Sequence, residues 1–314
     1  MRVAITGATG LIGGVLARAF AGDGHEIVVV SRRAAAARRL RTGVEPARVV
    51  AWDPARGEID AAGLEGCDVV IHLAGEPIAG VWTRGKRARI RESRVRGTEL
   101  LAGALARLER PPAAFLSASG ANYYGDRPSD TPMDEDAPPG AGFLAETVVS
   151  WEAATRAAET AGIRTVRLRM GVVLTAAGGL LGAVLPLFRL GLGARLGGGE
   201  QLVSWIALDD VVAAIRHVLA TTSLSGPVNL VAPHAVTNAE FTRLLGRVLG
   251  RPTPFAVPAA VLRLLPGRVA DELLLAGARV VPRRLEETGF RFTYPELESA
   301  LRAALGLERR SSVT

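Results

Sequence analysis

A glycine-rich run near the amino terminus has the residue types that hold phosphate groups. Because glycine lacks a Cβ atom, the backbone of such a run can approach a pyrophosphate, whose charge then meets the free N–H groups and the positive dipole end of a helix. The last glycine also lets that helix pack closely on the preceding strand. We therefore predict a dinucleotide site here, the alternative being an ordinary strand-to-helix turn. The run consists of Gly7, Ala8, Thr9, Gly10, Leu11, Ile12 and Gly13.

The second expected strand ends in Ser31, Arg32 and Arg33. An acidic residue at this point would accept hydrogen bonds from the adenosine ribose and favour NAD. Two arginines can instead hold a 2′-phosphate through charge-assisted hydrogen bonds, which predicts NADP as the cofactor. A solvated basic turn that leads into an arginine-rich helix is the alternative interpretation.

A third segment, His72-Leu73-Ala74-Gly75, ends another expected strand at the ligand-binding edge of the sheet. We expect Leu73, Ala74 and Gly75 to pass beneath the cofactor. His72 is one of only four histidines and is a candidate for catalysis. A histidine that ends a buried strand is more often a hydrogen-bonded core residue.

Alternation of strand-length apolar runs with helix-period segments predicts the elements that position these residues. This pattern is typical of βαβ units and predicts an α/β fold with a doubly wound parallel sheet of Rossmann type. Helices are expected over Leu11–Ala21, Thr83–Arg107 and Phe143–Ala161. The expected strands are Arg2–Thr6, Glu26–Ser31, Arg48–Trp52, Val69–Leu73, Ala113–Ser117 and Thr165–Met170.

The second half of the chain has a different texture. Glycine pairs interrupt the pattern after Met170, so a substrate-side part is expected from about residue 171. A strand over Leu202–Ile206, a helix from Asp209, a strand over Val228–Leu230 and an amphipathic helix over Asn238–Leu249 are expected to follow. We predict a dinucleotide-binding domain at 1–235, a small, mostly helical region at 236–305 and a frayed tail at 306–314.

Together these segments resemble the extended short-chain dehydrogenase/reductase superfamily over residues 1 to about 235. The NAD(P)-dependent "epimerase family" branch, with its small C-terminal domain of unknown function, is the more specific resemblance. The matching motifs are Ser117-Ala118-Ser119, Tyr123-Tyr124-Gly125-Asp126, Phe143-Leu144-Ala145-Glu146, Trp151-Glu152, Ser204-Trp205-Ile206, Pro282-Arg283-Arg284-Leu285 and Gly289-Phe290-Arg291-Phe292.

The resemblance implies roles for several residues. Ser119 matches the serine that positions the substrate hydroxyl, although a turn-capping hydroxyl is the alternative. Ser117 and Arg94 occupy parts of the family pattern near the cofactor. Arg169, Ser204, Trp205 and Asp210 lie where the superfamily shapes its substrate side, where core packing and helix capping explain them nearly as well.

The Tyr-x-x-x-Lys pair that supplies the acid and base in this superfamily is absent. The helix after Phe143 has no tyrosine and no lysine through Thr160. Substitutes nearby are Tyr123, Tyr124, Glu146 and Glu152. We favour Glu146, because a carboxylate in a closed apolar cleft can exchange protons near neutral pH, with Tyr124 as a phenolic donor. A first-turn glutamate that complements the helix dipole and a packed tyrosine are the alternatives.

Composition limits the partners. The net charge of +7 comes from arginines scattered over the chain without one basic stripe, which argues against nucleic acid. Cys67 is the only cysteine, which suits a reducing cytoplasm and excludes an intrachain disulfide. No His/Cys spacing predicts a metal site, and no secretion leader or membrane span is expected. Dimerisation through two long helices is common in the superfamily, so a homodimer is expected by analogy.

These observations predict NADP-dependent hydride transfer on a small carbonyl or hydroxyl compound, such as a sugar derivative. The missing Tyr-x-x-x-Lys pair leaves open a non-catalytic NADP(H)-binding sensor or regulatory protein. A third alternative is an epimerase that acts on a nucleotide sugar and retains its cofactor tightly.

Overall fold

The computed structural model describes residues 1–32, 43–128 and 130–307. The chain forms two compact units, each assembled from separate stretches of sequence. The first unit contains Met1–Tyr123, Phe143–Arg169 and Val218–Val228, and the second contains Tyr124–Gly142, Met170–His217 and Asn229 to the C-terminus. The domain boundary expected at residue 235 stays a prediction.

A mostly parallel sheet, with the short strand β4 antiparallel to β3 at one edge, forms the centre of the first unit. In the described chain its strand order is β13-β8-β6-β5-β1-β2-β3-β4. Strand β1 pairs in parallel with both β2 and β5, which places Thr6 beside Val30 on one side and His72 on the other. The strands are β1 (Arg2–Thr6), β2 (Glu26–Ser31), β3 (Arg48–Asp53), β4 (Glu58–Ile59), β5 (Val69–His72), β6 (Ala114–Gly120), β8 (Arg164–Met170) and β13 (Gly226–Leu230).

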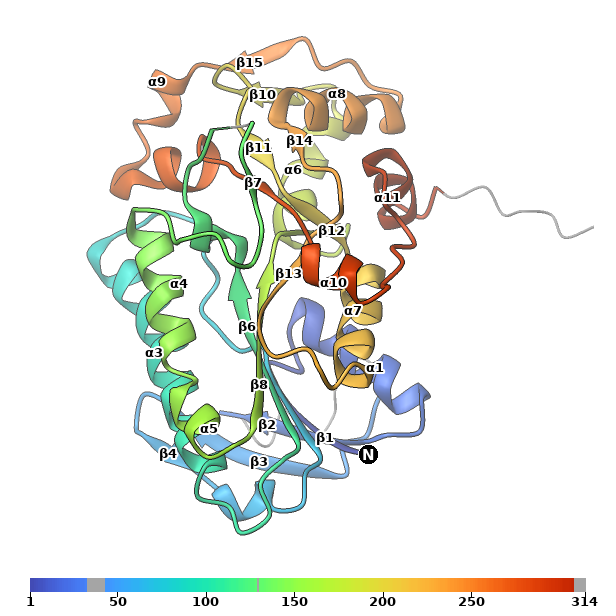
Figure 1. The fold of residues 1–314 in the computed structure, drawn as a ribbon. Helices are drawn as coiled ribbons and strands as arrows, with labels where there is room; N and C mark the ends of the chain where they lie inside the picture. Colours follow the sequence, from blue (N-terminus) through green and yellow to red (C-terminus); the bar gives the residue numbers. More distant parts are fainter. Residues whose placement is uncertain (33–42, 129, 308–314) are drawn as a thin grey trace, which may run out of the picture. The chain divides into compact units, whose positions relative to one another are not determined.

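Helices cover both faces of this sheet. Helix α1 (Leu11–Gly22) lies against one face, whereas α3 (Arg84–Leu105), α4 (Phe143–Ala153) and α5 (Arg156–Thr160) lie on the other (Figure 1). The core is built from strand residues with no exposed surface, such as Ala4, Val28 and Val70, packed with helix residues such as Leu101. This arrangement confirms the predicted α/β doubly wound fold.

The prediction of a single helix over Phe143–Ala161 is wrong, because the helix is interrupted at Thr155. The Thr155 hydroxyl donates to the carbonyl of Glu152 at 2.7 Å and lies 2.9 Å from the Glu159 carboxylate. A threonine hydroxyl that bonds to nearby main-chain and side-chain acceptors competes with helix hydrogen bonds. The segment therefore forms α4 and α5.

The second unit combines short strand pairs with helices around its own core. Trp205, Leu181, Leu245 and Leu301 have no exposed surface and belong to that core. Its strands are β7 (Pro132–Met133), β9 (Val172–Leu174), β10 (Ala194–Leu196), β11 (Leu202–Val203), β12 (Trp205–Ala207), β14 (Val236–Thr237), β15 (Phe255–Val257) and β16 (Arg279–Val280). Its helices include α6 (Gly179–Arg189), α8 (Asn238–Leu249), α9 (Ala259–Leu262), α10 (Arg283–Glu287) and α11 (Leu297–Ala304), and α7 (Leu208–Ala220) begins there.

The prediction of a single strand over Leu202–Ile206 is also wrong, because the segment forms two strands. Ser204 separates β11 from β12, because its hydroxyl donates to the carbonyl of Ala278 at 2.7 Å and accepts from the Val280 amide at 3.0 Å. Strand β11 then pairs antiparallel with β14, and β12 pairs in parallel with β9. A long-range side-chain contact thus divides one apolar run between two ladders.

Candidate functional site

The turn between β1 and α1 requires its glycines. Gly7 adopts a left-handed φ of 69°, and a Cβ there would lie 3.0–3.1 Å from the backbone of Leu73 and Ala74. A Cβ on Gly13 would approach the Gly7 carbonyl oxygen to less than 3.0 Å. Gly10 caps α1 without any side-chain hydrogen bond. The first N–H groups of α1 are thus left for a ligand, as an anion site at a helix start requires.

The loop after β5 is joined to this turn through Thr6. The amides of Leu73 and Ala74 donate to the Thr6 hydroxyl oxygen at 3.0 and 3.1 Å. Because these bonds occupy both lone pairs, the Thr6 hydrogen is directed at Nδ1 of His72, 2.7 Å away. The histidine therefore carries its hydrogen on Nε2.

His72 is fully buried and neutral. Burial lowers its pKa to about 4. The ring of Trp52 meets it edge-on at 5.7 Å between centroids. His72 thus behaves as the expected core residue and holds the strand ends that shape the dinucleotide turn.

Arg94 supports the third predicted cofactor segment. Its guanidinium lies 3.5 Å from the position that a Cβ on Gly75 would take. It donates to the carbonyls of Glu76 and Ile90 at 2.9 and 3.1 Å and lies 5.1 Å from the ring centroid of Trp151. Burial lowers the pKa of Arg94 to about 10, so it remains a cation at neutral pH. Arg94 therefore brings positive charge to the same edge of the sheet.

The predicted cofactor residues gather along the carboxyl ends of β1, β2 and β5. Parallel pairing places Ser31, at the end of β2, near the turn that follows Thr6. Ser31 is half-buried and Arg32 is exposed, whereas Arg33 lies outside the described residues. Thr9 and Gly10 are exposed, Leu11 and Ile12 are partly exposed, and Ala8 and Ser117 are buried.

Ser119, at the end of β6, belongs to a buried ionic network. Its hydroxyl donates to Oε1 of Glu152 at 2.6 Å. Arg169 donates to both Glu152 oxygens, from Nε at 2.8 Å and from a terminal nitrogen at 2.9 Å. The same guanidinium lies 3.5 Å from the ring centroid of Tyr123. Since the Ser119 hydrogen is directed at Glu152, its oxygen can only accept a hydrogen bond from another molecule.

Sequence reasoning favoured the wrong face of α4 for a buried carboxylate. Glu146 is exposed in the first turn of α4, whereas Glu152 is 8% exposed. Helical periodicity carries the signal, because Glu152 follows Val148 by four residues and Ala145 by seven, and both are buried. The closed surroundings assumed for Glu146 are those of Glu152, and the catalytic role of Glu146 stays a prediction.

Tyr124 begins the second unit and is fully buried there. Its hydroxyl donates to Oδ1 of Asn229 at 2.7 Å. The Asn229 amide group donates to the carbonyl of Val281, and its main-chain N–H donates to Glu135, at 2.9 and 3.0 Å. Burial raises the pKa of Glu135. Tyr124 thus packs with its hydroxyl satisfied, and its catalytic role also stays a prediction.

Other residues singled out in the second unit hold segments together. Both carboxylate oxygens of Asp210 accept main-chain bonds, from Thr293 at 2.8 Å and Tyr294 at 3.0 Å. The Trp205 ring is buried in the core and donates to the carbonyl of His234 at 3.0 Å. Asp210 therefore holds a loop, and Trp205 packs in the core.

The basic helix α3 is partly neutralised at its start. Glu76 forms ion pairs with Lys86 at 2.9 Å and Arg89 at 3.5 Å. The hydrogen bond from Lys86 lowers the pKa of Glu76. Arg87 instead lies 4.4 Å from the ring centroid of Phe143. Part of the basic charge of α3 is therefore committed to internal contacts.

No helix in the described ranges is long and apolar enough to cross a membrane. No three His, Cys, Asp or Glu side chains among these residues gather in a way that could hold a metal ion.

The parallel sheet and the glycine turn define a Rossmann-type protein. The chain belongs to the NAD dependent epimerase/dehydratase family, whose model matches residues 3–230. Residues 257–304 match a second model, a domain of unknown function (DUF1731). The resemblance inferred from the sequence is thereby confirmed.

Similar proteins span almost the whole chain. Epimerase family protein Mb2239 of Mycobacterium bovis is 43% identical over 300 residues, which are 95% of this chain and 96% of the relative. The crystal structure of human epimerase family protein SDR39U1 (isoform 2) with NADPH is 35% identical, with a TM-score of 0.84 and 98% and 99% of the two chains covered. The nucleoside-diphosphate sugar epimerase of Corynebacterium glutamicum is 32% identical, with a TM-score of 0.79, and covers 99% of this chain and 59% of that protein.

Proposed function

We propose that this chain binds NADP(H) and catalyses hydride transfer between the nicotinamide and a small carbonyl or hydroxyl compound. The observation that carries this proposal is the fit of Gly13 against the Gly7 carbonyl, which leaves no room for a side chain and lets the start of α1 pack closely on the turn after β1. The amides at the start of α1 and the half-buried cation Arg94 supply positive potential at the same edge of the sheet. These features suit a dinucleotide better than an ordinary turn.

Arg32 supports NADP(H) over NAD(H). It is exposed at the end of β2, where its guanidinium can pair with a 2′-phosphate. The NADPH in the crystal structure of human SDR39U1 supports the same choice. The proposed cofactor set also includes Leu73, Ala74, Gly75, Ser117 and Arg33.

At the reacting end we propose that Ser119 contacts the substrate oxygen. A substrate hydroxyl that donates to Ser119 Oγ has a hydrogen-bonded route for its proton along Ser119 to the carboxylate of Glu152. When bound, NADP⁺ would supply the hydride acceptor for this oxidation. Arg169 holds Glu152 in place with two hydrogen bonds. An alcohol that becomes a carbonyl compound fits this acceptor orientation.

We also propose Tyr124 and Glu146 as candidates for the proton donor. The Tyr124 hydroxyl is committed to Asn229, and Glu146 faces solvent. In the reduction direction either group would have to deliver a proton to the substrate oxygen, which requires hydrogen-bond reach. Their variants therefore serve as comparisons for Ser119.

A second candidate function is an NADP(H)-binding sensor without turnover. It is favoured by the lack of a Tyr-x-x-x-Lys pair, since Leu144 and Val148, four residues apart and buried in α4, are apolar. With the Tyr124 hydroxyl bound internally as well, proton transfer depends on the Ser119 network.

The test is a calorimetric titration of the purified protein with NADPH and NADH, followed by an alcohol and carbonyl panel monitored at the nicotinamide absorbance. Tight NADPH binding with turnover that Ser119→Ala abolishes, without loss of NADPH affinity, is the expected result. Binding without turnover on any compound would favour the sensor, and failure to bind NADPH would overturn both candidates. A cofactor that copurifies and does not exchange would favour nucleotide-sugar epimerisation.

A further inference from the structure

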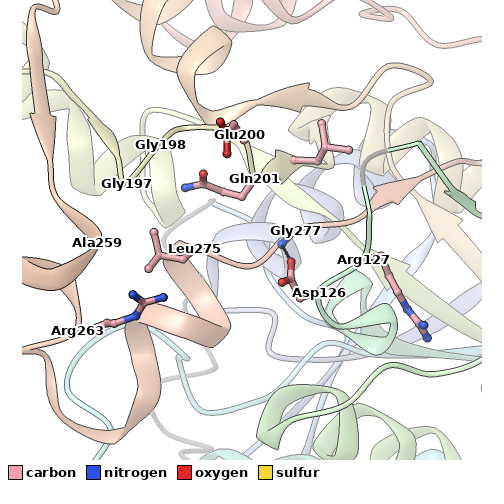
Figure 2. A pocket seen from close by; sticks show the side chains of 11 residues that line it. Asp126, Arg127, Gly197, Gly198, Glu200, Gln201, Ala259, Arg263, Leu275 and Gly277 are labelled. Carbon is pink, nitrogen blue, oxygen red and sulfur yellow. Dashed lines mark hydrogen bonds between the residues drawn. The ribbon is translucent and has the colours of Figure 1, made fainter.

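The second unit contains a cavity that the proposed function does not use. Its volume is about 340 Å³, and its walls come from residues 126–127, 197–198, 200–202, 259, 263, 275 and 277 (Figure 2). Small-molecule sites usually occupy roughly 300 to 1,000 Å³, so this cavity is at the lower end of that range. Its size suits a single sugar ring or an open polyol better than a nucleotide sugar.

Oxygen acceptors gather around this cavity. Asp126 uses one carboxylate oxygen to accept from the Gly277 amide at 3.0 Å, and its other oxygen is left for a ligand. Glu200 forms no hydrogen bond or ion pair with any residue in the described part of the chain. Gln201 donates from its amide nitrogen to the carbonyls of Leu196 and Leu274 at 3.1 and 2.9 Å, which leaves its oxygen as an acceptor. Such a wall recognises a ligand that donates several hydrogen bonds.

The two arginines of the cavity are already paired. Arg127 donates to the carbonyls of Tyr124 and Pro139 at 3.0 and 2.9 Å, and its guanidinium points away from Gln201 and Leu275 (Figure 2). Arg263 forms a 2.9 Å ion pair with Asp271. Phosphate recognition relies on cations that face the phosphate without a competing carboxylate. Two carboxylates at the wall therefore disfavour a phosphorylated ligand.

Apolar surface completes the wall. Leu275, Leu202 and Ala259 contribute it beside the carboxylates, and Figure 2 places Leu275 between Gln201 and Arg263. A sugar or polyol presents C–H groups as well as hydroxyls, so it can pack on leucine while it donates to carboxylates. A metal ion or a simple amine would make no use of this apolar surface.

We propose that this cavity binds an uncharged polyhydroxyl compound of monosaccharide size, with hydroxyl groups that donate to Asp126, Glu200 and Gln201. The proposal goes beyond the proposed function, because the cavity lies within the second unit and its argument uses no property of the dinucleotide turn. It also departs from the nucleotide sugar in the name of the Corynebacterium glutamicum relative.

The test is ligand-observed NMR on the full-length protein, without cofactor, with D-glucose, sorbitol and myo-inositol as neutral probes. Glucose 6-phosphate and UDP-glucose are the charged comparators. We expect at least one neutral probe to bind more tightly than either charged comparator. We also expect Glu200→Gln and Asp126→Asn each to lower the affinity for that probe by about tenfold. The reason is that each change replaces a hydrogen bond to a charged acceptor with one to a neutral amide.

Glu240→Gln is the matched control, because Glu240 is exposed in the same unit but does not line the cavity. Its affinity for the neutral probe should equal that of the wild type. The proposal is overturned if no neutral probe binds, if UDP-glucose binds more tightly than every neutral probe, or if the Glu200 and Asp126 variants bind like the control. A separate NADPH titration of these variants shows whether the dinucleotide site is intact, so that the two proposals fail independently.

Discussion

Thr6 and His72 are joined by a 2.7 Å hydrogen bond between the threonine hydroxyl and Nδ1 of the histidine, inside the sheet of the first unit. The oxygen of the same hydroxyl accepts hydrogen bonds from the amides of Leu73 and Ala74. One side chain therefore fixes the histidine tautomer and the backbone that faces Gly7. Stability and the shape of the dinucleotide turn are linked at this point.

The stability of the protein should fall with acidity because of His72. Its pKa is about 4 in the folded protein against an ordinary value of 6.5, so the unfolded chain takes up the proton first. Stability from this residue is complete above pH 6.5 and is lost as the pH falls toward 4, by about 3 kcal/mol. Urea unfolding between pH 7 and pH 4.5 should therefore give a steeper decline for the wild type than for His72→Gln. Parallel declines in the two proteins would contradict this.

Gly13→Ala should remove dinucleotide binding, because its Cβ would collide with the Gly7 carbonyl. We expect NADPH affinity to fall by at least about tenfold, equivalent to roughly 1.4 kcal/mol. Calorimetric titration measures the affinity, and thermal unfolding reports whether the fold persists. Gly22→Ala is the matched control in the same helix, because nothing lies within 4 Å of its Cβ position. Equal NADPH affinity in the two variants would count against the turn as the binding site.

Local physics accounts for what the sequence predicted well. Helix α8 was predicted to the residue, because Thr237 caps its start and Gly250 ends it with a left-handed φ of 63°. The close contact of Gly13 with Gly7 was equally readable because it is local, whereas the contact of Gly7 with Leu73 and Ala74 depends on the pairing of β1 with β5. Contacts between distant residues were not readable, as the division of one apolar run at Ser204 illustrates, because its partners Ala278 and Val280 are more than seventy residues away.

In the candidate site, too, local features were predictable and long-range contacts were not. Residue types and spacing predict which residues hold the cofactor, but the hydrogen-bond partners of Ser119 and Tyr124 depend on the fold. Glu152 is 33 residues from Ser119, and Asn229 is 105 residues from Tyr124. Arg169 is 17 residues from Glu152, so the residues around the missing Tyr-x-x-x-Lys pair do not reveal that these two side chains form an ion pair.

Arg32→Ala should lose most of the preference for NADPH over NADH. The lost hydrogen bonds to a charged phosphate correspond to about 1.5 to 3 kcal/mol, while NADH affinity should stay unchanged. Arg18→Ala is the control, since Arg18 is an exposed arginine of α1. Competition titrations of both variants with the two cofactors check the expectation. If the wild type binds NADPH and NADH equally, the argument from Arg32 fails.

Glu152→Gln should destabilise the protein strongly, because it leaves the guanidinium of Arg169 buried without a negative partner. The side chains of Arg169 and Glu152 are only 4% and 9% exposed, and breaking a buried pair in this way costs about 3 to 5 kcal/mol. Replacing both residues, as in Glu152→Leu with Arg169→Met, should recover part of that loss, because no unpaired charge remains. Glu58→Gln, which breaks the exposed pair with Arg56, should change stability by less than about 1 kcal/mol.

The double variant also separates structure from chemistry at Ser119. If Glu152 only holds α4 against β8, the more stable double variant should regain turnover along with its fold. If Glu152 receives the proton from Ser119, turnover should stay low in every variant that lacks the carboxylate, while NADPH affinity remains near that of the wild type. Chemical unfolding, NADPH titration and initial rates on the same protein preparations distinguish the two. Full turnover in the double variant would rule out the proton route through Glu152 and leave Ser119 as a positioning group alone.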